Sequence, residues 1–168
     1  AADHEVVALA RTADRARRVA ELGARPHQGD ILDGTGLRRG VDGCDAVVNV
    51  ASSIPPMTKF MRTKPWAANE RVRIEGSAAI VDAAVAAGVP RLIQESVCML
   101  YRDGGTHWLD EGWPTDRYRI ATGNHAAEAS AHRFTAAGGT GVVLRFGLFY
   151  GPGARHSEQF LAMARFGL

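Results

Sequence analysis

Short apolar runs alternate with amphipathic stretches along the whole chain. Segments with the length of β-strands lie at residues 5–10, 25–28, 45–51, 91–96 and 141–146, and all but 25–28 contain apolar or β-branched runs. Stretches with helical patterning separate or follow them at residues 13–22, 33–41, 70–87, 117–137 and 157–166. In the longest of these, 70–87, the apolar residues Ile74, Ala78, Val81 and Val85 recur at three- and four-residue steps, which predicts one apolar helix face. The alternation predicts βαβ units and therefore a parallel sheet with helices on both faces.

This pattern predicts an α/β fold, a Rossmann-like doubly wound parallel sheet in three layers. The strands are nearly continuous apolar runs, as a sheet covered on both faces requires. No linker or internal repeat divides residues 1–168, so a single domain is expected. Ligands of such sheets bind beyond the carboxyl ends of the strands. The candidate binding residues are therefore those at and just after the strand ends, namely Arg11, Thr12, Asp30, Ile31, Ala51, Ser52, Ser96 and Phe146.

Composition and charge narrow the choice of partners. The 168 residues are 46% apolar and 23% charged, which excludes disordered and disulfide-scaffold classes. A net charge of +2, spread along the chain, gives no reason to expect a nucleic-acid surface. No apolar run approaches the roughly 20 residues of a membrane span. The only cysteines, Cys44 and Cys98, stand in apolar surroundings, so we expect buried thiols and a cytoplasmic protein.

Four motifs in order resemble a known enzyme family. They are the strand at 4–11, the Gly-Asp-Ile-Leu-Asp turn at 29–33, Asn-Val-Ala-Ser at 49–52, and Leu-Arg-Phe-Gly-Leu-Phe-Tyr-Gly-Pro-Gly at 144–153. Together they resemble the extended branch of the short-chain dehydrogenase/reductase superfamily, the NAD-dependent epimerase/dehydratase family. The resemblance implies an NAD(P) cofactor, a small carbonyl or hydroxyl substrate and hydride transfer. A homodimer is also expected.

The expected cofactor site lies at the ends of the first strands. Arg11 closes a strand where the adenosine ribose would lie, and its guanidinium can pair with a 2′-phosphate, so NADP is favoured and NAD is the second choice. The alternative is a surface arginine at a helix start, which Thr12 caps. The resemblance implies adenine contacts for Asp30 and the Ile31 backbone. It also implies contacts of residues 51–52 with the cofactor's ribose and pyrophosphate. Asp30 is equally well explained as a turn residue.

The family's glycine-rich phosphate loop is absent from these residues. In the 3-2-1-4-5-6 strand order of the fold, the family's first strand lies in the centre of the sheet. The strands at Val6 and Val47 would both border it. We therefore expect residues 1–168 to be an incomplete domain, without the first strand and without a substrate-binding segment beyond Leu168. Direct pairing of the strands at Val6 and Val47 would contradict this expectation.

The family's Tyr-x-x-x-Lys pair is not conserved in this chain. In the family the Tyr is the acid/base and the Lys ammonium lowers its pKa. If Glu128 takes the place of the family's helix glutamate, Asn124 stands at the Lys position and Ile120 at the Tyr position. Tyr118 is two residues early, a rotation of about 200° on a helix, and would face away unless the helix start is irregular.

The expected catalytic residues are Ser96 and Tyr118. Ser96 is the best polar group at its strand end and would orient the substrate oxygen, although Val97 stands where the family has its usual catalytic serine. A hydroxyl that merely closes the strand is the competing interpretation. Tyr118 or a water would donate the proton. Arg73 stands at the position of a family asparagine, for which Asn69 is a possible shifted substitute.

Three functional hypotheses follow. The first is an NADP-dependent oxidoreductase, epimerase or dehydratase. The second is a non-catalytic NADP-binding sensor or regulatory protein that has lost the Tyr/Lys pair. The third is an interaction domain that binds no nucleotide. No metal site is expected, because the spacing of His125, Glu128 and His132 favours a solvated helix face.

Overall fold

The computed structural model describes residues 3–60, 62–151 and 154–165. The strands are β1 (Val7–Ala10), β2 (Arg25–Gln28), β3 (Val47–Asn49), β4 (Arg91–Val97) and β5 (Thr140–Phe146). The α-helices are α1 (Ala13–Glu21), α2 (Gly34–Val41), α3 (Ala67–Arg71), α4 (Ser77–Ala86), α5 (Thr122–Ala136) and α6 (Arg155–Arg165). The predicted strand–helix alternation is confirmed, with strand ends shifted by up to two residues.

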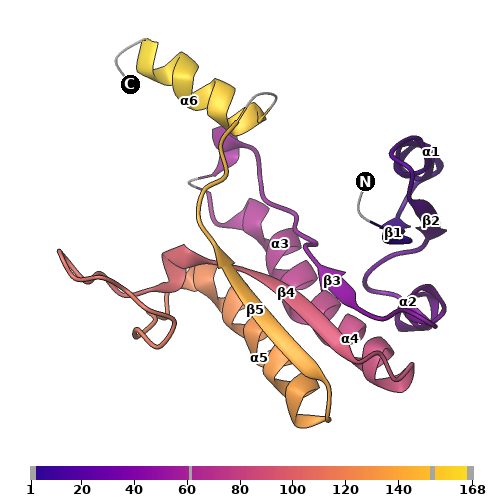
Figure 1. Ribbon diagram of the computed structural model, residues 1–168. Helices are drawn as coiled ribbons and strands as arrows, with labels where there is room; N and C mark the ends of the chain where they lie inside the picture. The colour runs from indigo at the N-terminus through magenta and orange to yellow at the C-terminus, as the bar shows by residue number, and fades with distance from the viewer. Residues whose placement is uncertain (1–2, 61, 152–153, 166–168) are drawn as a thin grey trace.

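The strands form two parallel sheets. β1 pairs with β2, and β3, β4 and β5 pair in that order. No ladder joins β1 to β3 within the described residues, and the two sheets stand apart in Figure 1. The Rossmann-like α/β prediction is confirmed. The further strand expected between β1 and β3 stays a prediction.

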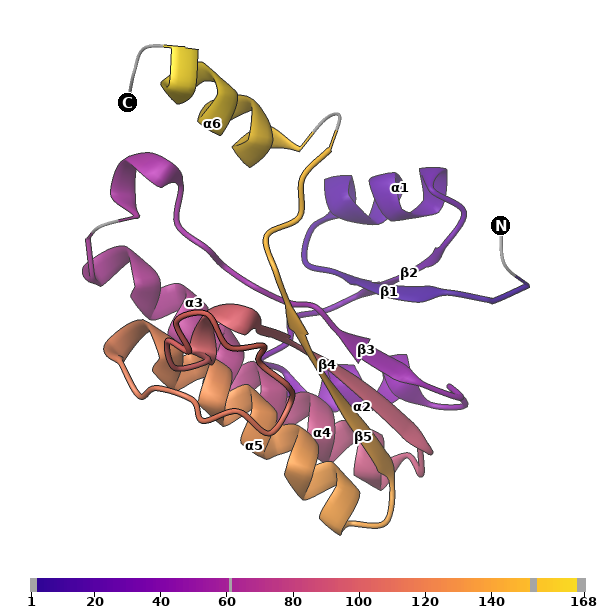
Figure 2. The same ribbon diagram turned by 60° about the vertical axis from the view of Figure 1, so that its left-hand side comes forward.

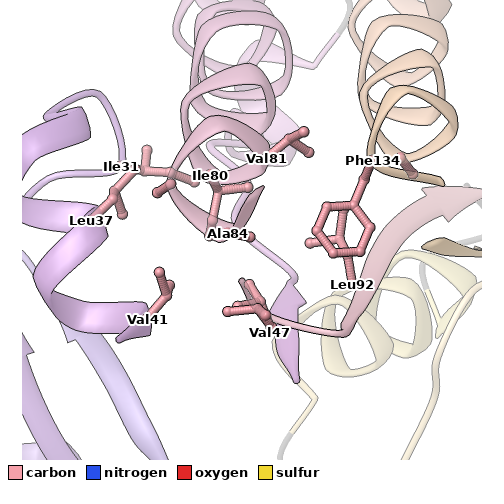
Figure 3. Packing of buried hydrophobic residues seen from close by; sticks show 12 residues of the cluster. Ile31, Leu37, Val41, Val47, Ile80, Val81, Ala84, Leu92 and Phe134 are labelled. Atoms are coloured by element: carbon pink, nitrogen blue, oxygen red, sulfur yellow. The ribbon is translucent and has the colours of Figure 1, made fainter. Parts of the chain in front are cut away.

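Helices cover the two sheets differently. α4 and α5 pack on one face of the three-stranded sheet, whereas α1 and α2 lie on either side of β1 and β2 (Figures 1 and 2). The main apolar core forms where α2, α4 and α5 meet β3 and β4 (Figure 3). Its buried members include Leu37 from α2, Ala84 from α4, Leu92 from β4 and Phe134 from α5. The core therefore holds β4, whose end carries Ser96, against β3 and the helices.

The long helix predicted over 70–87 contains a π-turn. α3 is followed by one turn of π-helix, η3 (Val72–Gly76), which leads directly into α4. The predicted apolar face is partly wrong, because Ile74 and Val85 are exposed while Arg73 and Ile80 are buried. A π-turn adds a residue to one turn and rotates the side chains that precede it relative to those that follow. The regular periodicity assumed for the sequence therefore fails across this turn.

The segment before α5 is irregular. The predicted helix over 117–137 begins five residues late, and a 3₁₀ turn, η5 (Arg119–Ala121), precedes it. Tyr118 has an extended backbone and lies outside α5.

The expectation of two buried thiols is wrong, since Cys98 is exposed and Cys44 is half-buried. Among the described residues, no helix has both the length and the apolar character needed to cross a membrane.

Candidate functional site

The carboxyl end of β1 carries an unpaired cation. Arg11 is the first residue after β1, is exposed, and makes no hydrogen bond or ion pair within the described part of the chain. Thr12 caps α1, and its Oγ1 accepts a hydrogen bond from Arg15 N at 3.3 Å. The strand end therefore presents a free guanidinium beside the start of a helix, an arrangement that suits an anionic group.

The ends of β2 and β3 carry small or turn-forming residues. Asp30 Oδ1 accepts a hydrogen bond from Leu32 N at 3.0 Å, so Asp30 closes the turn after β2 as the turn interpretation predicts. Ile31 is buried, and its side chain packs against the backbone of Gly76, which leaves its main chain for any ligand contact. Beyond β3, Ala51 N donates to Asn49 Oδ1 at 3.2 Å, and Ser52 is exposed.

A buried hydrogen-bonded cluster lies at the carboxyl end of β4. Ser96 is fully buried, and its Oγ donates to Glu128 Oε1 at 2.6 Å. Arg145 of β5, which pairs in register with Ser96, donates to both carboxylate oxygens of Glu128 at 2.8 Å. The Arg145 guanidinium also stacks on the Tyr101 ring at 4.7 Å. The expectation that Glu128 lies on a solvated face is therefore wrong, because α5 turns this residue toward the sheet.

The cluster keeps Glu128 ionised. Burial by itself raises the pKa of this carboxyl group, but the hydrogen bonds from Arg145 and Ser96 and the charge of Arg145 outweigh burial and lower it. The hydrogen bonds that Arg145 donates to Glu128 raise the pKa of Arg145. A carboxylate that stays ionised accepts hydrogen bonds only, so the Ser96 proton is directed at Glu128.

Tyr118 is not part of this cluster. Its hydroxyl donates to the Met99 carbonyl at 3.0 Å, and its side chain is 42% exposed. Burial, followed by the charges of Asp116 and Cys98, raises the pKa of Tyr118. The structure thus places the two predicted catalytic residues in different surroundings, Ser96 buried below the strand end and Tyr118 on the loop that follows it.

A second buried ion pair ties the π-turn to β4. Arg73 is 2% exposed and donates from Nη1 to the Glu95 carbonyl at 2.9 Å and from Nη2 to Glu95 Oε1 at 2.8 Å. Because side chains alternate along a strand, Glu95 lies on the opposite face of β4 from Ser96. Glu95 follows Gln94, the last residue of β4 that pairs with β3. Arg73 therefore bonds to β4 just beyond the part that is paired with β3.

Three buried polar side chains join β3, β4 and α4. Asn49 Nδ2 donates to Ser77 Oγ at 3.2 Å and to Gln94 Oε1 at 2.9 Å. Gln94 Nε2 in turn donates to the Glu95 carbonyl at 2.9 Å. These bonds satisfy the polar groups just below the strand ends and hold the edge of the sheet rigid.

Asn124 stands one helical turn before Glu128. Its side chain is 8% exposed, and Oδ1 has no hydrogen-bond partner among the described residues.

Phe146, the last residue of β5, pairs in register with Val97, and its ring packs 5.1 Å from that of Phe149. The end of β5 is therefore apolar, whereas the end of β4 is polar.

The sequence pattern did not predict either of the two buried ion pairs, Arg73–Glu95 and Arg145–Glu128. A signal was present in the run Gln94-Glu95-Ser96, because polar residues in an otherwise apolar strand need buried partners. The identity of those partners was not readable. Arg73 lies 22 residues from Glu95, and Glu128 lies 32 residues from Ser96, so only the fold brings these partners together.

The residues present fit a dinucleotide. All strands in each sheet run parallel, so their carboxyl ends share one edge. Arg11 follows β1, and Asn124 stands one helical turn before Glu128, the partner of Ser96. The Arg11 guanidinium and Asn124 Oδ1 have no hydrogen-bond partner within the described residues. Both are groups that a phosphate or hydroxyl would satisfy.

Comparisons with known proteins agree with this arrangement. A family model described as NAD(P)H-binding matches residues 1–147. A 3-diazoavenalumate denitrifying reductase from a Streptomyces species is 32% identical over 167 residues, which cover 93% of this chain and 52% of that protein. The chain thus spans about half the length of this curated relative.

Solved structures share the fold at lower identity. A dTDP-glucose 4,6-dehydratase from Streptomyces venezuelae with NAD bound has a TM-score of 0.72 at 21% identity, covering 96% of this chain and 53% of that one. An NADPH-dependent quinone oxidoreductase from Escherichia coli with NADPH has a TM-score of 0.58 at 20% identity, covering 95% and 43%. These structures show the fold, and the family model shows that this chain belongs to the NAD(P)H-binding family.

Proposed function

We propose that the chain is the dinucleotide-binding part of an NADP-dependent oxidoreductase that acts on a small carbonyl or hydroxyl substrate. The observation that carries the proposal is the row of residues along the shared strand-end edge, from Arg11 to the Ser96–Glu128 cluster. The reductase relative supports the direction of reduction.

Different residues of the chain would contact different parts of the dinucleotide. Arg11 would hold the 2′-phosphate, with the start of α1 beside it, and the turn at Asp30 and Ile31 would contact the adenine. Residues 51–52 leave space for the ribose and pyrophosphate because their side chains are small. The nicotinamide would supply a hydride near the end of β4. Glu128 and Arg145 hold the Ser96 hydroxyl in one orientation there.

Binding is tested by thermal denaturation with NADP, NAD or no ligand. A ligand at 100 times its dissociation constant stabilises the folded state by about 2.7 kcal/mol, which appears as a rise in Tm. Arg11→Ala should weaken the binding of NADP by tenfold or more and leave the binding of NAD nearly unchanged. Arg18→Ala, an exposed arginine on α1, is the matched control. Equal weakening of both dinucleotides by Arg11→Ala would contradict the 2′-phosphate role.

Catalysis is tested at Ser96 and Tyr118. We expect Tyr118→Phe and Ser96→Ala to slow NADPH oxidation with a panel of carbonyl compounds. Tyr118→Phe leaves the ring in place and removes only the hydroxyl that now bonds to Met99. Unchanged turnover in both variants would remove these two residues from the mechanism.

A non-catalytic NADP-binding sensor is the second candidate. The Ser96 hydroxyl is fully buried and committed to Glu128, and Asn124 stands at the family's Lys position, which favours binding without proton transfer. Tight NADPH binding without turnover on any carbonyl or alcohol would select this alternative. A cytoplasmic location and a homodimer stay predictions.

We also propose that a further parallel strand fits between β1 and β3. Each of these strands pairs on one side only. Hydrogen exchange tests the proposal, because the amides of β1 and β3 that face the gap should exchange faster than those of β4, which is paired on both sides. Equal protection in all three strands would contradict it.

A further inference from the structure

Both candidate catalytic hydroxyls at the end of β4 are already bonded to protein acceptors. Ser96 is fully buried, and its Oγ donates to Glu128 Oε1 at 2.6 Å. The Tyr118 hydroxyl donates to the Met99 carbonyl at 3.0 Å. A carbonyl oxygen that becomes negatively charged during hydride transfer is stabilised by a hydrogen-bond donor aimed at it. In this arrangement neither Ser96 nor Tyr118 directs its proton at a ligand, so we looked for another donor at the same strand end.

Tyr101 brings a hydroxyl group to this edge of the sheet. It follows η4 (Cys98–Leu100), the 3₁₀ turn that leads away from the carboxyl end of β4. Its ring lies against the guanidinium of Arg145, with 4.7 Å between Cζ and the ring centre, and Arg145 pairs in register with Ser96. The side chain is half-buried, and its hydroxyl donates to no acceptor within the described residues. The phenol proton is therefore available to a ligand.

The main chain on both sides of Tyr101 is held in place. An isolated antiparallel bridge joins Tyr101 to Thr115, and Asp116 N donates to the Leu100 carbonyl at 2.8 Å. The Asp116 carbonyl bonds in turn to the His125 ring on α5 at 2.9 Å. The phenol thus has a fixed position relative to β4 and α5, and little conformational freedom is lost when it binds a ligand.

Arg145 determines where the phenol proton points. Its Nε and Nη2 donate to Glu128 at 2.8 Å, which leaves Nη1 outside that pair. The pKa of Arg145 is raised first by its hydrogen bonds to Glu128 and, against the effect of burial, by a hydrogen bond to Tyr101. A guanidinium only donates hydrogen bonds, so the phenol oxygen accepts this one and its own proton is directed elsewhere.

We propose that the Tyr101 hydroxyl donates a hydrogen bond to the carbonyl oxygen of the substrate. This inference rests on the proposed function. The carbonyl carbon takes a hydride from NADPH and the carbonyl oxygen takes a proton from Tyr118 or water, so Tyr101 keeps its own proton. The hydrogen bond from Tyr101 strengthens as negative charge builds on the oxygen, and it therefore stabilises the transition state more than the bound substrate.

Steady-state kinetics of Tyr101→Phe test this role, with NADPH and either 4-nitrobenzaldehyde or 2,3-butanedione. The variant keeps a ring against Arg145 and loses only the hydroxyl. We expect kcat to fall by about 100-fold, with the KM for the carbonyl compound, the dissociation constant of NADPH and Tm nearly unchanged. Tyr150→Phe is the matched control, since Tyr150 is 90% exposed on the segment after β5. It should leave turnover unchanged.

Calorimetry with isobutyramide adds a measurement that does not depend on turnover. The carbonyl oxygen of this amide accepts hydrogen bonds, but the amide does not take a hydride from NADPH. We expect isobutyramide to bind NADPH-saturated Tyr101→Phe about 3–10-fold more weakly than the NADPH-saturated wild type, as the loss of one hydrogen bond predicts. Tyr150→Phe should bind it as the wild type does.

The outcomes separate this inference from the proposed function. Equal turnover and equal amide affinity in the wild type and Tyr101→Phe overturn the inference alone. A wild type that binds NADPH but neither reduces a carbonyl compound nor binds the amide also overturns it. A loss of turnover with a matching fall in Tm or in NADPH affinity assigns the hydroxyl to the framework instead. Failure of the wild type to bind NADPH or NADH overturns the proposed function.

Discussion

The two sheets of this protein differ in how deeply their side chains are buried and in how many polar contacts join them to helices. In the β1–β2 half no residue of α1 is buried, Leu22 is 80% exposed, and Ala10 is the one buried residue of its strands. In the β3–β4–β5 half, Leu92 and Phe134 are almost fully buried, and polar clusters join every strand to a helix. Burial is concentrated in one half, while the side chains of the other are mostly exposed.

The arginine side chains of the two halves also differ, because those discussed in one half are paired with carboxylates and the one in the other half is not. Arg11 at the end of β1 has no partner within the described residues, whereas Arg73 and Arg145 are each bound to a carboxylate. A free, solvated guanidinium costs little to keep, but a buried one is tolerated only when paired. The paired arginines therefore belong to the framework, and the free one is available for recognition.

The largest expected effect is at the buried pair. Arg73→Met should lower the free energy of unfolding by about 3–5 kcal/mol, because it leaves Glu95 without its partner. The control is Arg133→Met, which breaks an exposed pair with Asp82 and should cost about 0–1 kcal/mol. Urea denaturation measures both. Similar losses in the two variants would remove the contrast between buried and exposed pairs.

Truncation of apolar side chains should also affect the stability of the two halves very differently, almost as much as the arginine variants do. Phe134→Ala removes a ring that is 1% exposed and should cost about 3–5 kcal/mol. Leu22→Ala, in the exposed end of α1, should change stability by less than about 0.5 kcal/mol. A large loss from Leu22→Ala in denaturation experiments would mean that α1 is packed in solution more tightly than this structure shows.

The smallest effect concerns pH and Glu128. The pKa of this carboxyl is lower in the folded protein than its usual value near 4.5, so it contributes stability above that pH. The contribution is lost as pH falls below about 4.5 toward the folded pKa. Glu128→Gln should be less stable at pH 7 by about 1–3 kcal/mol, and the gap to the wild type should narrow toward pH 3. A constant gap across this range would contradict the lowered pKa.

Local patterning predicted most of the fold but not the irregular turns. The strand at 91–96 and the core position of Val81 followed from apolar runs and helical spacing, which depend on nearest neighbours alone. The π-turn at Val72–Gly76 and the 3₁₀ turn at Arg119–Ala121 did not, because both depend on what packs against them. They nevertheless place Arg73 and Tyr118, so the local errors fall at the candidate site.

By itself, the sequence determined the parallel α/β architecture, the strand ends that carry Arg11, Asp30 and Ser96, and the absence of any Tyr-x-x-x-Lys run. These are properties of residue type and spacing. Only the tertiary structure decided that Ser96 donates to Glu128, that Arg73 pairs with Glu95, and that Asn124 Oδ1 is buried without a hydrogen-bond partner among the described residues. The physical reason is that a buried polar group is defined by its partner, and these partners come from other elements of the fold.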